Sequence, residues 1–143
     1  MGLDMYLTRE HYVKNFDFMS ADERWTISIS VPEEIDVSKV VSISEEIHCW
    51  YGARSIQKWF VENVQEGEDN CARYWVSVEQ LQELAENSRR VLEDPSLAKE
   101  LLPPADAFFF GPTPTEEYLE ELRDTLAAIK DLPDGDYCFS ASW

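Results

Sequence analysis

Rings and positive charges gather in one ten-residue stretch, where strand-like residues give way to helical spacing. Arg54 and Lys58 are four residues apart, so on a helix both heads reach one point. Trp50, Tyr51 and Trp59 would place aromatic rings beside them. Rings that stack and cations that pair with phosphate or carboxylate suit a planar anionic ligand such as a nucleotide. The stretch therefore predicts a small-ligand site.

A simpler alternative for this stretch stays open. Trp59 recurs with Ile56 and Phe60 at helical spacing, which is typical of a residue buried in the core. Lys58 stands four residues before Glu62, and such a pair forms an ion pair along a helix. On this interpretation the stretch is structural and binds nothing.

Three further rings complete the predicted ligand site: Phe109, Tyr118 and Trp143. Phe109 stands between Phe108 and Phe110, and three consecutive rings in an extended segment cannot all face one core. At least one is expected at a pocket or an interface, which makes a homodimer reasonable. The alternative is a loop that closes the open end of the core, and Trp143 has the same ambiguity.

Catalytic and metal-binding patterns are weak. The two histidines, His11 and His48, are far apart, and His48 and Cys49 point to opposite faces if they lie in a strand. The five glycines are scattered singly, so the chain has no phosphate-binding loop. With 29 acidic residues, paired carboxylates arise by chance. We expect no catalytic residue, no metal and no cofactor, and a binding protein rather than an enzyme.

Net charge is the strongest compositional signal, at −17 from 29 acidic and 12 basic residues. Such a field repels nucleic-acid phosphates and anionic lipid. Direct nucleic-acid binding is therefore disfavoured. The field either serves solubility or mimics nucleic acid and occupies the basic groove of a nucleic-acid-binding protein. Three unpaired, widely spaced cysteines predict a cytoplasmic protein, and the apolar runs are too short to span a membrane.

The elements that must position these residues fall into two groups. Alternating residues predict strands at 3–7, 25–31, 40–47 and 137–143, and the second of these has the clearest alternation. Helical spacing predicts helices at 53–65, 77–92 and from about 114 to 129. This order favours an α+β fold: an antiparallel sheet of about four strands with three helices mainly on one face. We expect one domain over residues 1–143.

Two helix starts are marked by capping residues. Ser77 and Gln80 form a capping box, and Val76 and Leu81 a hydrophobic staple. For the third helix the sequence predicts Thr113 as the cap, with proline at the first helical position.

Several blocks resemble a widespread family of small, uncharacterised phage and prophage proteins. The blocks that carry the resemblance are residues 2–7 (GLDMYL), 58–64 (KWFVENV), Asp69 with Cys71, 101–103 (LLP), 108–111 (FFFG) and 140–143 (SASW). Trp50 and Trp59 match the family, whereas Arg54 and Gln57 stand where members often carry Asn and His. The resemblance implies a viral or prophage origin and a bacterial host cytoplasm, and implies no established reaction.

Two functions follow as hypotheses. In the first, the protein sequesters a small anionic host molecule, such as a signalling nucleotide, as a counter-defence factor. In the second, it is an acidic, nucleic-acid-mimicking inhibitor of a basic host protein.

Overall fold

The computed structural model describes residues 2–26, 28, 30, 34–104 and 114–143. Within these residues the strands are β1 (Asp4–Tyr12), β2 (Ser42–Tyr51), β3 (Tyr74–Val76) and β4 (Asp136–Ser142). The α-helices are α1 (Arg54–Asn63), α2 (Val78–Glu93), the short α3 (Ala98–Leu101) and α4 (Glu116–Ile129), with 3-10 turns at Val37–Lys39 and Pro95–Leu97.

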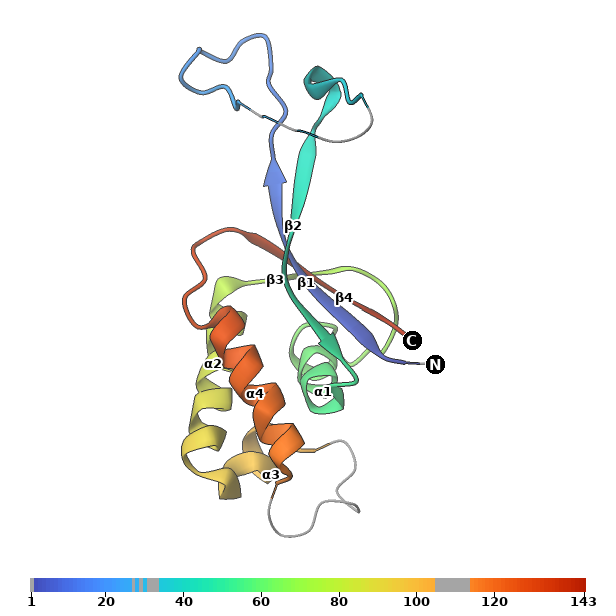
Figure 1. The fold of residues 1–143 in the computed structure, drawn as a ribbon, viewed down its shortest axis with the longest axis vertical. Helices are drawn as coiled ribbons and strands as arrows, with labels where there is room; N and C mark the ends of the chain where they lie inside the picture. The colour runs from blue at the N-terminus through green and yellow to red at the C-terminus, as the bar shows by residue number, and fades with distance from the viewer. Residues whose placement is uncertain (1, 27, 29, 31–33, 105–113) are drawn as a thin grey trace.

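The four strands form one antiparallel sheet in the order β2-β1-β4-β3. Central β1 pairs Met5 with Trp50 on one side and with Ala141 on the other. β4 stops pairing with β1 at Asp136, while β1 and β2 continue as a two-stranded ribbon to the pair Tyr12 and Ser42. Figure 1 shows this ribbon rising away from the helices.

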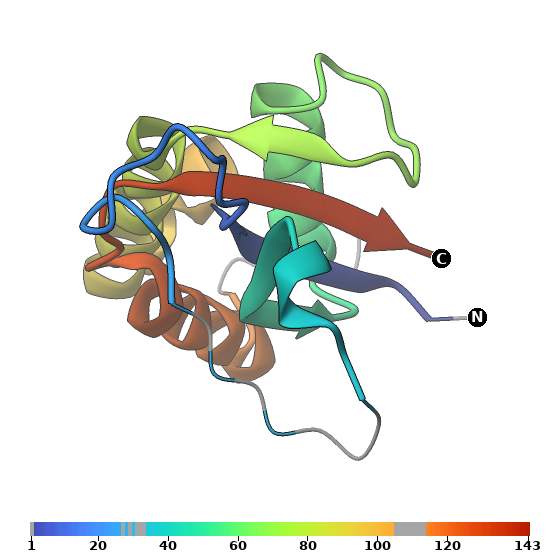
Figure 2. The same ribbon diagram turned by 90° about the horizontal axis from the view of Figure 1, so that it is seen from above.

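Helices α1, α2 and α4 cover one face of the sheet (Figures 1 and 2). The side chains on that face are apolar and buried: Leu7 and Phe139 are directly opposite each other, and both are fully buried. Phe60 of α1 stacks on Phe139 with ring centroids 3.8 Å apart. The α+β prediction is confirmed, with α3 as a short additional helix. Among the described residues no helix is long and apolar enough to cross a membrane.

The starts of α1 and α2 have clear local causes. Gly52 has a φ of +71°, a conformation that favours glycine, and its N–H donates to the Leu3 carbonyl at 2.7 Å. This turn leads β2 directly into α1. At α2 the predicted capping box is present: the Gln80 N–H donates to Ser77 Oγ at 3.1 Å, and Gln80 Oε1 accepts from the Ser77 N–H at 3.0 Å.

Three details differ from the sequence-based expectations. The cap of α4 is Thr115, whose Oγ1 accepts from the Tyr118 N–H at 3.2 Å; Thr113 lies outside the described residues. Strand β3 and helix α3 were not predicted. The strand predicted at 25–31 is wrong for the described residues of that range, which are exposed and carry no strand assignment. Of the apolar positions of that range only Trp25 is described, and it is 51% exposed.

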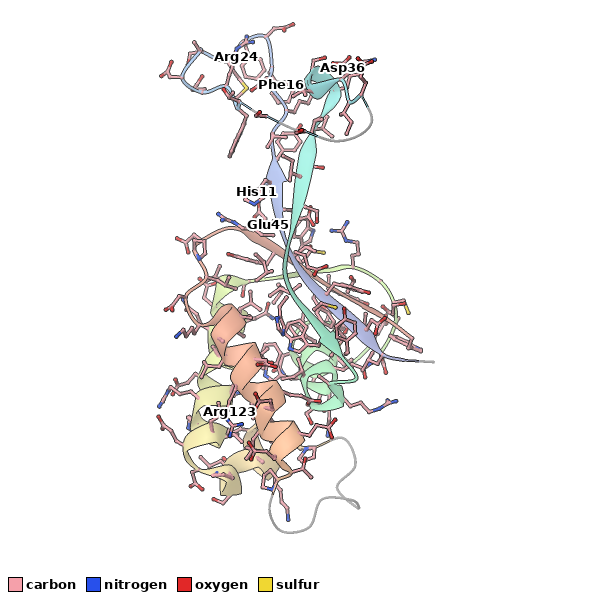
Figure 3. All side chains as sticks on the ribbon, in the orientation of Figure 1. His11, Phe16, Arg24, Asp36, Glu45 and Arg123 are labelled. Atoms are coloured by element: carbon pink, nitrogen blue, oxygen red, sulfur yellow. The ribbon has the colours of Figure 1, made fainter. Side chains whose placement is uncertain are left out.

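An extended segment links β1 and β2. We call its described residues (13–26, 28, 30 and 34–41) the arm. It projects from the end of the ribbon, away from the helical layer (Figures 1 and 3). Phe18 is 86% exposed, and Trp25, Ile35 and Val41 are also exposed. Local contacts shape the arm, for example the pair of hydrogen bonds between Asn15 and the backbone of Trp25 at 2.8 and 3.0 Å.

Candidate interaction site at the base of the arm

The two indoles of the predicted ligand site belong to the core. Trp50 is 3% exposed and Trp59 is 5% exposed. The Trp50 ring lies edge-on to Phe60, and its Nε1–H donates to Thr125 Oγ1 of α4 at 2.8 Å. The expectation of two exposed, stackable indoles is therefore wrong. Both rings face the covered side of the sheet, and the polar edge of Trp50 is satisfied by a buried hydroxyl.

The two cations of that site are Arg54 and Lys58. Arg54 is exposed to solvent, and Lys58 faces an acidic hollow. Lys58 Nζ lies 3.9 Å from Glu62, so the simpler alternative, with Trp59 in the core and Lys58 paired to Glu62, is confirmed. Lys58 also lines a hollow of about 340 Å³. Glu62, Glu83 and Glu100 line the same hollow, and their charge disfavours an anionic ligand there.

The remaining predicted residues do not converge. Tyr51 is 75% exposed on the face of the sheet opposite to Trp50, and Trp143 is exposed after the end of β4. Tyr118 is buried in α4, and its hydroxyl donates to the Leu102 carbonyl at 2.6 Å. Phe109 lies outside the described residues. Ligand binding by this set stays a prediction, without the exposed indoles on which it depended.

A different hollow lies on the uncovered face of the sheet, where the ribbon leaves β4. Its volume is about 330 Å³. We call it the crook, because it occupies the angle between the sheet and the base of the arm. Figure 3 labels His11 and Glu45 at this point of the ribbon. The residues that line the crook are Glu10, His11, Tyr12, Ser42, Arg73, Trp75, Asp136 and Cys138.

An ion pair forms one side of the crook. Glu10 Oε1 lies 2.7 Å from Arg73 Nη2 and accepts from the hydroxyls of Thr8 and Ser44, each at 2.8 Å. Partial burial would raise the pKa of Glu10, but the hydrogen bonds from Ser44 and Thr8 and the Arg73 guanidinium outweigh it and lower that pKa. Glu10 therefore favours its ionised form and holds Arg73 in an ion pair across the sheet.

Two exposed rings form the other part of the crook. Trp75 of β3 is 68% exposed and Tyr12 of β1 is 59% exposed. Asp136, at the start of β4, adds an exposed carboxylate, and among the described residues it has no ion-pair partner within 4.0 Å. His11 beside the rings is paired with Glu45, with Nε2 and Oε1 3.1 Å apart. The crook thus combines aromatic surface with an unpaired negative charge.

Sequence reasoning missed the crook because its residues come from all four strands and from Arg73, directly before β3. Only the strand order and register bring them together. The one available signal was two rings outside the predicted elements, Tyr12 and Trp75.

The described residues hold no group of three His, Cys, Asp or Glu side chains arranged for a metal ion. No model of a known family, no curated protein and no solved structure matches the chain.

Proposed function

We propose that this protein is a non-enzymatic binding module that docks on a basic, nucleic-acid-handling host protein and blocks its groove. The observation that carries the proposal is the arm, an extended element that presents large apolar side chains to solvent. Of the two functions considered from the sequence, this one does not depend on the indoles of Trp50 and Trp59, which are buried.

The arm supplies apolar contact surface. Monomeric proteins rarely expose several large apolar side chains on one projecting element, and such surfaces mark interaction sites. Phe18, Trp25 and Ile35 are exposed there. The arm projects beyond the sheet and its covering helices, which we call the body (Figure 1). A projecting element of this kind suits insertion into a partner's groove. Burial of these side chains in a complex would provide affinity.

The body supplies the charge. Exposed Glu116 and Glu120 lie along α4, and a single cation, Arg123, contacts both, at 2.6 and 2.7 Å. One positive charge shared between two carboxylates leaves this surface negative. With a formal net charge of −17, the protein would attract a basic partner over distance and repel acidic proteins.

The test is capture of host proteins on the immobilised protein, with duplex DNA as competitor. We expect a basic protein that is released by the DNA and by raising salt from about 0.1 M to about 0.5 M, because screening weakens charge attraction. A doubly neutralised variant, Glu116→Gln with Glu120→Gln, should capture less of it. Capture that neither DNA nor salt reduces would contradict groove mimicry.

A further inference from the structure

Arg73, the basic side chain that lines the crook, already has an ion-pair partner within the protein. The Glu10 carboxylate takes the Arg73 guanidinium at 2.7 Å together with two hydroxyl donors. An anionic ligand approaching Arg73 would be repelled by the carboxylates of Glu10 and Asp136, which line the same hollow. Because Glu10 balances the charge of Arg73, the ion pair contributes almost no net charge to the crook.

The charge that remains open in the crook is negative. Asp136 of β4 lies directly opposite Glu10 of β1 in the strand register, so the two side chains lie on the same, uncovered face of the sheet. Trp75 and Tyr12 stand on that face with most of their ring surface exposed. Exposed rings beside an unpaired carboxylate are the combination that attracts a cation, because the ring faces and the carboxylate are both negative.

We propose that the crook receives an arginine side chain of the basic partner, stacked on Trp75 or Tyr12 and paired with Asp136. This inference rests on the proposed function, since it names the contact by which a basic protein is recognised. A guanidinium is favoured over a lysine ammonium because it is planar, stacks on an indole and pairs with a carboxylate through two N–H groups. A volume of about 330 Å³ is ample for such a side chain.

The crook also stands beside the arm, because Tyr12 and Ser42 end the ribbon from which the arm continues. A partner held by the apolar arm would therefore place its nearby basic residues over the crook. The arm would contribute contact area and the crook would contribute selectivity for positive charge.

The experiment is a titration of the isolated protein with N-acetyl-arginine amide, followed by NMR at the indole N–H of Trp75. We expect a saturable shift of the Trp75 signal and little shift of Trp143, which is also exposed but lies outside the crook. N-acetyl-lysine amide should bind more weakly, and the uncharged N-acetyl-citrulline amide more weakly still. Asp136→Asn should reduce the affinity for the arginine probe about threefold or more.

Asp134→Asn is the matched control, since it removes the same charge two residues away from a side chain that does not line the crook. It should leave the titration unchanged. The inference is overturned if N-acetyl-glutamate shifts Trp75 and the arginine probe does not, or if citrulline binds as well as arginine. Equal shifts at Trp75 and Trp143 would also overturn it, since they would indicate non-specific attraction.

The titration needs no partner, so it is independent of the capture experiment. A partner that is captured by the protein and equally by Asp136→Asn would overturn the arginine contact alone. A normal titration with no DNA-sensitive capture would overturn the proposed function and leave the crook as a cation-binding hollow.

Discussion

The body and the arm are built on opposite principles. In the body, the large rings pack on one another, and the buried indole N–H of Trp50 donates to Thr125. In the arm, comparable rings face solvent, and the contacts are local, such as Phe16 against Phe18 at 5.3 Å between centroids. The body therefore supplies the free energy of folding. The exposed apolar residues of the arm contribute little to the packed core, and we propose that they serve binding.

Removing one stacked ring from the core should give the largest difference between the two regions. Phe139→Ala takes away a fully buried ring that lies 3.8 Å from Phe60. We expect a loss of about 3–5 kcal/mol in the free energy of unfolding, measured by urea denaturation. Phe18→Ala on the arm should change it by less than about 0.5 kcal/mol. Similar losses in the two variants would show that the arm is part of the folding unit.

Trp50 in the body and Trp25 in the arm allow the same comparison for an indole ring and its N–H. Trp50→Phe removes the Nε1–H that donates to buried Thr125 and leaves a smaller ring in the core. A loss of about 2 kcal/mol is expected from the lost buried hydrogen bond and the vacated volume, although the Thr125 hydroxyl still donates to the Glu121 carbonyl at 2.7 Å. Trp25→Phe, at an exposed ring of the arm, is the control and should be close to neutral. Equal effects would argue that Trp25 is covered in solution.

Glu121 on α4 provides a pH test of burial in the body. Burial, and to a lesser degree the charge of Glu117, raises the pKa of Glu121 from 4.5 to about 7. The folded state then holds this proton more tightly than the unfolded state, so the free energy of unfolding falls as pH rises from about 4.5 to about 7.

Glu121→Gln should remove that decline. Because the carboxyl is only half buried, we expect the variant to be about 1–2 kcal/mol more stable than wild type at pH 8, and nearly equal at pH 4. Glu34→Gln on the arm makes the same charge change at an exposed position and should leave the pH profile unaltered. Parallel profiles for wild type and Glu121→Gln would contradict the assigned burial.

Two caps give the smallest expected effect. Ser77 caps α2 in the body, and Asp36 caps the 3-10 turn of the arm by accepting from the Ser38 N–H at 3.1 Å. Ser77→Ala should lower the free energy of unfolding by about 1 kcal/mol. Asp36→Ala should lower it by less than half as much, because the turn that it caps contributes little to the cooperative core. Thermal unfolding of the two variants compares them directly.

Local signals explain most of what the sequence predicted about the fold. The capping box of Ser77 and Gln80 and the helical spacing of Ile56, Trp59 and Phe60 depend only on near neighbours in the chain. The strand predicted at 25–31 is absent from the described residues of that range for the opposite reason. Alternation is a local pattern, but a strand also needs a partner and a covering layer, which are set by the rest of the chain.

The candidate site was less accessible to sequence reasoning. The cluster around Arg54 and Lys58 was recognised because its residues are close in sequence, but burial of Trp50 depends on contacts with α4, 75 residues away. The crook is assembled from positions as distant as Glu10 and Arg73, 63 residues apart. Strand order alone brings such residues together, and it is not encoded in any short pattern.

One variant tests most directly whether the arm serves binding rather than folding. Phe18→Ser combined with Trp25→Ser removes two exposed rings from the arm and leaves the body unaltered. We predict that capture of the basic partner is lost while the free energy of unfolding stays within about 1 kcal/mol of wild type. Retained capture, or a loss of stability comparable with that of Phe139→Ala, would contradict this account.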